Sequence, residues 1–379
     1  MNIPFHKALI TEEEINNVVD ALRSGWITMG PKVMEFEKLF TEFINGKSED
    51  KKIRTLLVNS CTSALHLALK AIGLKEGDEV ILPTTTFIAT AEVVTYFNAK
   101  PVLCDIDEKT MNIDVTKIES LITNKTKAII PVHFAGQPCD MDEILEIAKK
   151  NRLFVIEDAA HAFPAYYKNK SVGTIGDITC FSFYATKTLA MGEGGAITTD
   201  NEEFLRSMKI NRLHGISRDA WDRYTMKGSW YYEVVDNGLK YNSTDINAAL
   251  GIAQLKKADY MHNERIKIAK RYLEILKENK NIILPYVKDD RISAWHLFVI
   301  RVGNRNELIE VLKDKGVGTS VHFIPVHRHP YYRDKYNLKD VDYPVANRVF
   351  EGVLSLPIYP GLKDEEIDYI IENLLKYAK

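Results

Sequence analysis

The chain has 379 residues, 45% of them hydrophobic and 27% charged, with a formal net charge of −2 at pH 7. This length exceeds what one typical core supports, so we expect two domains or one large α/β domain with an addition. Charge is balanced along the chain, which argues against binding to nucleic acid or to an anionic membrane. The start, MNIPFHKALITEEEINN, lacks the features of a secretion signal, and no run of about eighteen apolar residues occurs. We therefore expect a cytoplasmic protein.

Cysteine and histidine usage gives little support for a metal site. The four cysteines are isolated and form no C-x-x-C pair; they are Cys61, Cys104, Cys139 and Cys180. His322, His327 and His329 lie close together in HFIPVHRHPYY, as zinc ligands often do, but no nearby carboxylate or cysteine completes a ligand set. We expect reduced thiols and no metal.

Over about the first two hundred residues, short apolar runs alternate with amphipathic helical stretches. The strand-like runs are IRTLLVN, DEVILP, KPVLCDI, KAIIPVHF, LFVIEDAAHA, DITCFSF and GGAITTD, and the helical stretches include SALHLALKAIGL and FIATAEVVTYF. Strands buried on both faces are continuously apolar, as these runs are. The alternation predicts a mainly parallel sheet covered by helices.

The pattern changes near residue 244, where apolar residues recur at helical spacing as far as residue 280 and predict one long helix. A smaller α+β region follows. AWHLFVIRV and TSVHF are typical of strands, whereas RNELIEVLKDKGVG and KDEEIDYIIENLLKYAK are typical of helices. We expect a large domain over residues 1–250 and a small C-terminal α+β domain over residues 251–379.

Three strand ends carry polar residues suited to chemistry, and ligands of open α/β sheets collect at the carboxyl ends of strands. In VNSCTSALHLAL, backbone N–H groups at a helix start suit a phosphate. In VIEDAAHAF, Asp158 follows an apolar strand, and His161 comes three residues later. In FSFYATKTLAMGEGG, Lys187 is delivered beside aromatic residues that would lower the proton affinity of its amine. Phosphate site, buried carboxylate and activated lysine together are what pyridoxal phosphate (PLP) requires.

Each of these features has an ordinary alternative. Ser60 or Thr62 would serve as a helix N-cap, and Glu157 or Asp158 as a salt-bridge partner. His161 would be a half-buried histidine, and Lys187 a solvated turn residue. The glycines of MGEGG precede a strand instead of opening a helix, so they do not form a dinucleotide-binding fingerprint, and an NAD-linked oxidoreductase is disfavoured.

The sequence also resembles the DegT/DnrJ/EryC1/StrS family of sugar aminotransferases along nearly its whole length. The motifs that carry the resemblance are SGWITMGPK, SCTSALHLAL, EVILPTTTFIAT, PVHFAGQPCDMD, VIEDAAHAF, FSFYATKTLAMGEGGAITT, KYNSTDINAALG, AWHLFVIRV and VHFIPVH. They are long and occur in the family's order. The resemblance implies a type I (aspartate) aminotransferase fold and PLP as cofactor.

Roles carried over from the family apply to matching positions only. Lys187 matches the lysine that forms the Schiff base with PLP, and Asp158 matches the partner of the pyridine nitrogen. His161 stands near the ring hydroxyl, and Phe87 matches the aromatic side chain that stacks on the ring. The phosphate contacts match the backbone of Cys61 and Thr62 and the hydroxyl of Ser182.

Asn242 matches an asparagine that family members extend across a dimer interface to the neighbour's phosphate, so a homodimer with shared active sites is implied. A helix N-cap or turn role for Asn242 is the alternative, although Thr244 or Asp245 could take that cap. We expect Trp26 and Thr28, in SGWITMGP, and His322, in HFIPVH, to border the sugar substrate.

Three positions depart from the family pattern. Cys61 and Pro164 stand where many relatives have glycine, and Tyr184 stands where histidine is frequent. Cys61 keeps its backbone N–H, so the phosphate contact survives there. Pro164 has no N–H and a fixed φ, so its loop need not follow the path that the family has there.

The resemblance implies transamination, with L-glutamate as amino donor and a nucleotide-linked keto-sugar as acceptor. Lys187 distinguishes the chain from related sugar dehydratases, which carry histidine at that position. The resemblance is greatest to enzymes that aminate C4 of a UDP-linked keto-sugar for cell-surface polysaccharides such as lipopolysaccharide. Amination of a 3-keto sugar linked to dTDP or GDP, and a non-catalytic ligand-binding protein of the same fold, are the alternatives.

Overall fold

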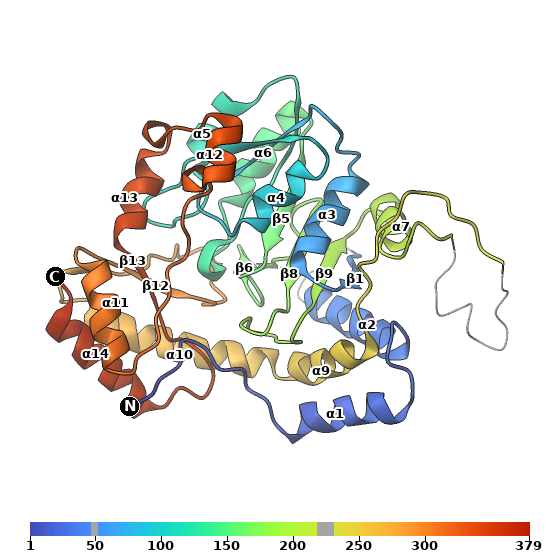
Figure 1. Ribbon diagram of the computed structural model, residues 1–379. Helices are drawn as coiled ribbons and strands as arrows, with labels where there is room; N and C mark the ends of the chain where they lie inside the picture. Colours follow the sequence, from blue (N-terminus) through green and yellow to red (C-terminus); the bar gives the residue numbers. More distant parts are fainter. Residues whose placement is uncertain (47–51, 218–230) are drawn as a thin grey trace.

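The computed structural model describes residues 1–46, 52–217 and 231–379 (Figure 1). Within these residues a seven-stranded sheet has the order β1-β9-β8-β5-β4-β2-β3. Strand β9 runs antiparallel to both of its neighbours, and the other pairs are parallel. The mainly parallel sheet is confirmed. Its strands are β1 (Arg54–Val58), β2 (Glu79–Pro83), β3 (Lys100–Cys104), β4 (Thr126–Ile129), β5 (Phe154–Ala159), β8 (Ile178–Ser182) and β9 (Gly195–Thr199).

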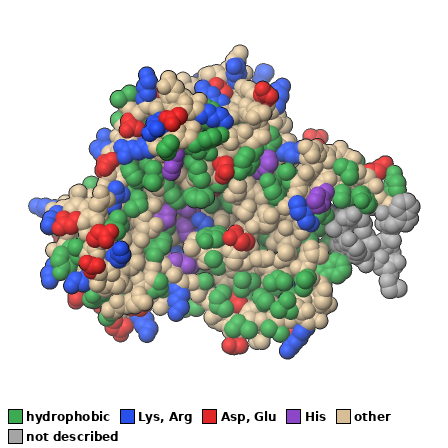
Figure 2. Space-filling view, in the orientation of Figure 1, with side chains coloured by type: hydrophobic (Ala, Val, Ile, Leu, Met, Phe, Trp, Pro, Cys, Tyr) green, Lys and Arg blue, Asp and Glu red, His purple; other side chains and the backbone are tan. Residues whose placement is uncertain are grey.

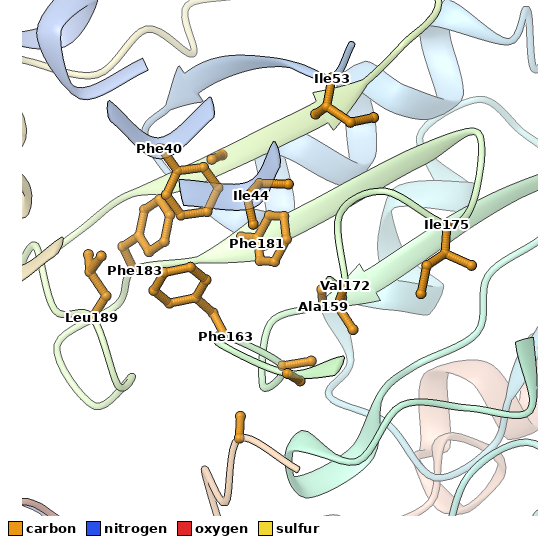
Figure 3. Close-up of a cluster of buried hydrophobic side chains, with 14 of the residues drawn as sticks. Phe40, Ile44, Ile53, Ala159, Phe163, Val172, Ile175, Phe181, Phe183 and Leu189 are labelled. Atoms are coloured by element: carbon orange, nitrogen blue, oxygen red, sulfur yellow. The ribbon is translucent and has the colours of Figure 1, made fainter. Parts of the chain in front are cut away.

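Helices cover both faces of this sheet, and each face has its own apolar cluster. One face is covered by α2 (Pro31–Asn45), α5 (Val115–Leu121), α6 (Met141–Asn151) and α9 (Asp245–Lys256). The other is covered by α3 (Cys61–Ala71), α4 (Ala89–Thr95) and α7 (Glu202–Asn211). Phenylalanines fill the centre of the first cluster, where Phe40 packs against Phe181 and Phe183 (Figure 3). Burial on both faces explains why the strands are continuously apolar.

The C-terminal residues build a second sheet, β10-β12-β13, with its own apolar cluster. Its strands are β10 (Ile282–Ile283), β12 (Phe298–Val302) and β13 (Val353–Leu356), and the helices that pack with it are α10 (Ala258–Leu276), α11 (Arg305–Asp314) and α14 (Asp364–Tyr377). The short helices α12 (Pro330–Tyr336) and α13 (Pro344–Gly352) lie between α11 and β13 in the chain. A small third sheet joins β6 (Tyr166–Tyr167), β7 (Lys170–Ser171) and β11 (Arg291–Ile292). The domain boundary at residue 250 stays a prediction.

Three short 3₁₀ turns complete the described elements: η1 (Phe134–Gly136), η2 (Val326–Arg328) and η3 (Asp340–Asp342). No helix of the described residues has both the length and the apolar character that crossing a bilayer requires.

Two sequence-based expectations for this region are wrong. The long helix expected over residues 244–280 is interrupted at Lys257, whose φ of −103° and ψ of 7° are not helical, so α9 and α10 are separate. TSVHF forms no regular strand, because only Ser320 pairs, in an isolated bridge with Ser355. Apolar periodicity continues across the break, since both helices bury a face, and it therefore does not reveal where one ends.

Helix α1 (Glu12–Arg23) packs against α9, although the two are far apart in the sequence (Figure 1). Glu14 of α1 is buried at this junction and contacts Lys257, and Gln254 Nε2 donates to its carboxylate at 2.8 Å. Asp245, the first residue of α9, joins a second pair of distant elements by capping the start of α2. Its carboxylate accepts hydrogen bonds from the backbone N–H groups of Gly30 and Val33 at 2.8 and 3.0 Å.

Candidate active site

Lys187 lies in the loop that joins the antiparallel strands β8 and β9. The base of the loop is closed by Phe183 N–H, which donates to the Gly194 carbonyl at 2.9 Å, and by Met191 N–H, which donates to the Phe183 carbonyl at 2.8 Å. Gly195, where β9 begins, lies so close to the start of α3 that a Cβ there would be 2.4 Å from the Ser60 carbonyl carbon. The glycine therefore lets the lysine loop lie directly beside the N-terminus of α3.

The amine of Lys187 is enclosed by polar groups from distant parts of the chain. Its Nζ lies 3.4 Å from His296 Nε2. Burial lowers the pKa of Lys187 to about 8, and the positive charge of Arg265 acts in the same direction, whereas Cys61 and Asp158 oppose it. A fraction of the amine is therefore neutral near physiological pH, which a nucleophile or a proton acceptor requires.

Asp158 lies in β5 and directs its carboxylate into the same region. Thr90 Oγ1 donates to it at 2.7 Å, and the Ala160 N–H donates at 3.1 Å. Burial raises the pKa of Asp158, although both hydrogen bonds and the charge of Lys187 lower it. A cation placed against this carboxylate would stabilise its ionised form.

The neighbouring Glu157 points to the opposite face of the sheet, as alternation along a strand requires. It is fully buried and lies 2.9 Å from His133 Nε2, and Thr179 Oγ1 donates to it at 2.7 Å. The salt-bridge alternative therefore applies to Glu157, whereas Asp158 faces the lysine loop.

A pocket of about 490 Å³ lies among these groups. Seven of the predicted site residues line it: Cys61, Thr62, Phe87, Asp158, His161, Ser182 and Lys187. Cys61 and Thr62 begin α3, where N–H groups have no acceptor in a preceding turn. Phe87 is 59% exposed, so one face of its ring is open. Figure 2 shows this side of the molecule hollowed at its centre, with histidine side chains gathered in the hollow.

The His161 ring contacts two other rings of the site, tilted against His296 and stacked on Phe323. It lies 4.4 Å from the His296 ring and 5.8 Å from the Phe323 ring, measured between centroids. Its Nδ1 is buried and has no hydrogen-bond partner among the described residues. Burial and the positive charge of Lys187 hold the pKa of His161 well below its ordinary value, so the ring is neutral.

Four predicted residues do not line this cavity in the single chain. Trp26 Nε1 donates to the Met29 carbonyl at 3.1 Å, and the exposed Thr28 accepts a hydrogen bond from Asp245 N–H through its carbonyl. His322 lies near Lys187. Burial and, after it, the charge of Lys187 lower the pKa of His322 to about 4. Its Nδ1 lies 2.8 Å from Ser355 Oγ.

Asn242, the fourth of these residues, is not the N-cap of α9. Thr244 takes that position, since its hydroxyl accepts from Asn247 N–H at 3.2 Å. Asn242 Nδ2 donates to the Ser243 carbonyl at 3.1 Å, and its buried Oδ1 has no hydrogen-bond partner within the described ranges.

The structure also brings in residues that sequence reasoning missed. Thr90, Phe323 and His296 all lie at the site. His296 is part of AWHLFVIRV, but the pattern of that run reveals only a strand and not its neighbours. The three histidines considered as zinc ligands do not converge. His327 binds Thr84 and Asn347, and among the described residues no group of three potential ligands could hold a metal ion.

Known proteins share both the fold and much of the sequence of this chain. Among solved structures, Spr1654 of Streptococcus pneumoniae, assigned as a sugar aminotransferase, superimposes with a TM-score of 0.92 at 35% identity over 99% of this chain and 98% of its own. It has been solved in PMP, PLP and apo forms. The spore coat polysaccharide biosynthesis protein SpsC of Bacillus subtilis is 49% identical over 100% of this chain and 97% of its own. MJ1066 of Methanocaldococcus jannaschii, which is uncharacterized, is 51% identical over 99% of this chain and 97% of its own.

The superposition confirms the expected aminotransferase fold, and the relatives indicate a sugar aminotransferase. Residues 8–375 match the model of the DegT/DnrJ/EryC1/StrS aminotransferase family. The chain belongs to this family.

Proposed function

We propose that the protein is a PLP-dependent aminotransferase that uses L-glutamate to aminate a nucleotide-linked keto-sugar. The observation that carries the proposal is the joint burial of the Lys187 amine and the Asp158 carboxylate in one cavity beside the start of α3. The products are a nucleotide-linked amino sugar and 2-oxoglutarate. SpsC, by its name a protein of spore coat polysaccharide biosynthesis, supports a product destined for a surface polysaccharide.

The side chains present fit this cofactor. The Asp158 carboxylate suits a protonated ring nitrogen, and the unpartnered Nδ1 of His161 suits a ring hydroxyl. The N-terminus of α3, with Cys61 and Thr62, suits a phosphate, and the Ser182 hydroxyl lines the same cavity. Phe87 offers an open aromatic face to a flat ring. When bound, PLP supplies an aldehyde that exchanges amino groups and a ring that withdraws electrons from the reacting carbon.

The chain's own groups then divide the remaining work. Lys187 would hold the cofactor covalently between turnovers, and the free amine at its Nζ would take up the proton that leaves the α-carbon of glutamate. In the half-reaction with the sugar the same Nζ returns a proton. Asp158 keeps the ring charge in place, because its carboxylate is buried and the low local dielectric strengthens the interaction.

Homodimerisation with shared active sites belongs to the same proposal. The Nδ2 of Asn242 is the group that would donate to a neighbour's phosphate, in place of its bond to the Ser243 carbonyl. Trp26, Thr28 and His322 border the sugar-nucleotide in this arrangement. We favour a UDP-linked 4-keto sugar as the substrate. We propose that the reaction takes place in the cytoplasm.

The test is to load the purified protein with PLP and to add glutamate together with UDP-, GDP- or dTDP-linked keto-sugars. We expect a yellow protein that glutamate bleaches, and a product whose mass shows exchange of oxygen for an amino group. NMR of the product then locates the amine at C4 or C3. Lys187→Ala is the control and should show no steady-state turnover. A wild-type protein that binds PLP but forms no amino sugar from any of these substrates would contradict the proposal.

A further inference from the structure

His296 reaches the lysine amine from the C-terminal part of the chain, just before β12. It is 7% exposed, and its Nε2 lies 3.4 Å from Lys187 Nζ. Its Nδ1 is buried and finds no hydrogen-bond partner among the described residues. A buried polar atom without a partner is unusual and frequently belongs to a functional site.

The backbone that carries His296 is held by a separate set of contacts. Arg265 of α10 is buried, and its guanidinium donates through one nitrogen to the carbonyls of Trp295 and His296, each at 3.2 Å, and of Ile358 at 2.7 Å. The Leu297 N–H donates to the Ala135 carbonyl at 3.3 Å. The backbone position of His296 therefore does not depend on where the Lys187 side chain lies.

The surroundings of the amine determine which partner donates. The charged and titratable groups that act on it come from several elements: Asp158 on β5, Cys61 on α3, Arg265 on α10, and the histidines His6, His161, His296 and His322. Burial and the charge of Lys187 hold the pKa of His296 well below its ordinary value, so its ring is neutral. An ammonium group can only donate, so Nε2 accepts from it and the ring proton resides on Nδ1.

We propose that His296 is a positioning residue that receives the amine of Lys187 through Nε2 whenever this amine is not bonded to the cofactor. The inference rests on the proposed function and deepens it, since it specifies where the free amine of Lys187 lies while it transfers protons. Lys187 comes from the β8–β9 loop and His296 from the segment just before β12, so the contact also joins the two sheets' connections at the reacting amine.

The first experiment uses the apoprotein and needs no turnover. A trace amount of an amine-reactive anhydride is applied over a range of pH, and the labelling of Lys187 is quantified by mass spectrometry of its peptide. We expect a midpoint of about 8 for the wild type. In His296→Leu the apolar surroundings persist, but the ammonium loses its acceptor, so the midpoint should fall by about one pH unit. His296→Gln restores an acceptor and should move the midpoint back toward the wild-type value.

The second measurement is the single-turnover rate with glutamate on the PLP-loaded protein. We expect His296→Leu to be slower by about tenfold, because the amine is no longer held in place, and His296→Gln to recover part of the loss. His262→Leu is the matched control. His262 is buried on α10 and its Nε2 lies 2.8 Å from the Ser293 carbonyl, so it is a buried histidine of the same region that is held by a backbone carbonyl.

The outcomes separate the two claims. If His296→Leu leaves both the labelling midpoint and the rate within twofold of the wild type, or if His262→Leu alters them equally, the positioning role is wrong. If the wild type does not react with glutamate, the proposed function fails, while the labelling midpoints still decide the Lys187–His296 contact. Circular dichroism of each variant verifies folding, and His296→Gln provides the test should the leucine variant fail to fold.

Discussion

Asp158 illustrates how one side chain acquires a chemical role from its immediate neighbours. Burial favours the protonated acid, whereas the hydroxyl of Thr90 and the backbone N–H of Ala160 favour the carboxylate. These opposing effects leave the group responsive to a cation placed in the cavity. The adjacent Glu157 has its own partner, His133, and is not available for this purpose.

We predict that Asp158→Asn keeps bound PLP but reacts with glutamate more slowly by about a thousandfold, because the amide cannot balance a charge on the ring nitrogen. Absorbance of the bound cofactor and the single-turnover rate measure the two effects separately. A near-normal rate would show that the carboxylate has a structural role only.

Thr28 and His322 lie outside the cavity of the single chain, so their assignment to the sugar is open to a kinetic test. We predict that Thr28→Ala or His322→Ala raises KM for the sugar-nucleotide by about tenfold, through the loss of one hydrogen bond, and leaves the glutamate half-reaction nearly unchanged. Stopped-flow measurement of each half-reaction distinguishes this from a general defect. An equal loss of rate in both half-reactions would show that these residues do not belong to the substrate site.

At the scale of elements, Glu14 connects α1 to the junction between α9 and α10. Burial alone would raise its pKa, but contacts with Lys257, Thr11 and Gln254 outweigh this effect and lower the pKa of Glu14 to about 2. A carboxylate whose pKa is depressed in the folded state stabilises the fold above its ordinary pKa of 4.5. That contribution is lost as the pH falls from 4.5 toward 2.

We therefore predict that Glu14→Gln lowers the free energy of unfolding at neutral pH by about 3 kcal/mol, since it leaves the Lys257 charge without its buried partner. The difference between wild type and variant should shrink progressively in urea titrations below pH 4.5. A difference that stays constant between pH 6 and pH 3 would contradict the assignment of this pH dependence to Glu14.

The helices and strands differ in how far local sequence determines them. Strand ends near Asp158 and Lys187 are predictable because continuous apolar runs stop at polar residues there. The break at Lys257 is not, since periodicity continues through it. The cap of α2 is another example: Gly30 has no side chain to cap the helix, and the acceptor is Asp245, far along the chain. His296 is likewise 109 residues from Lys187, and no local pattern joins the two.

At the scale of the whole molecule, the proposed dimer makes a prediction that a monomer cannot satisfy. Lys187→Ala and Asn242→Asp should each be inactive alone, the second because its carboxylate would repel a neighbour's cofactor phosphate. If Asn242 acts across the interface, a mixed dimer has one intact site and one site with both changes. Refolding the two variants together at equal amounts should restore about a quarter of the wild-type sites.

Activity per site in that mixture is measured against each variant refolded alone. Wild-type protein refolded in parallel gives the recovery of the procedure. Absence of any restored activity, with mixed dimers demonstrated by mass spectrometry, would mean that Asn242 serves its own chain.

The packing of α1 on α9 also concerns how the chain is made. Between the end of α1 and the start of α9 lie about 220 residues. At ordinary rates of translation, α1 leaves the ribosome on the order of ten to forty seconds before its packing partner is synthesised. Throughout that interval its buried side, including Ala21, has no surface to pack on, whereas the lysine loop closes within a local strand pair. The first helix to be synthesised is therefore among the last to dock, and nascent chains that stop before residue 245 should be cleaved by protease within α1.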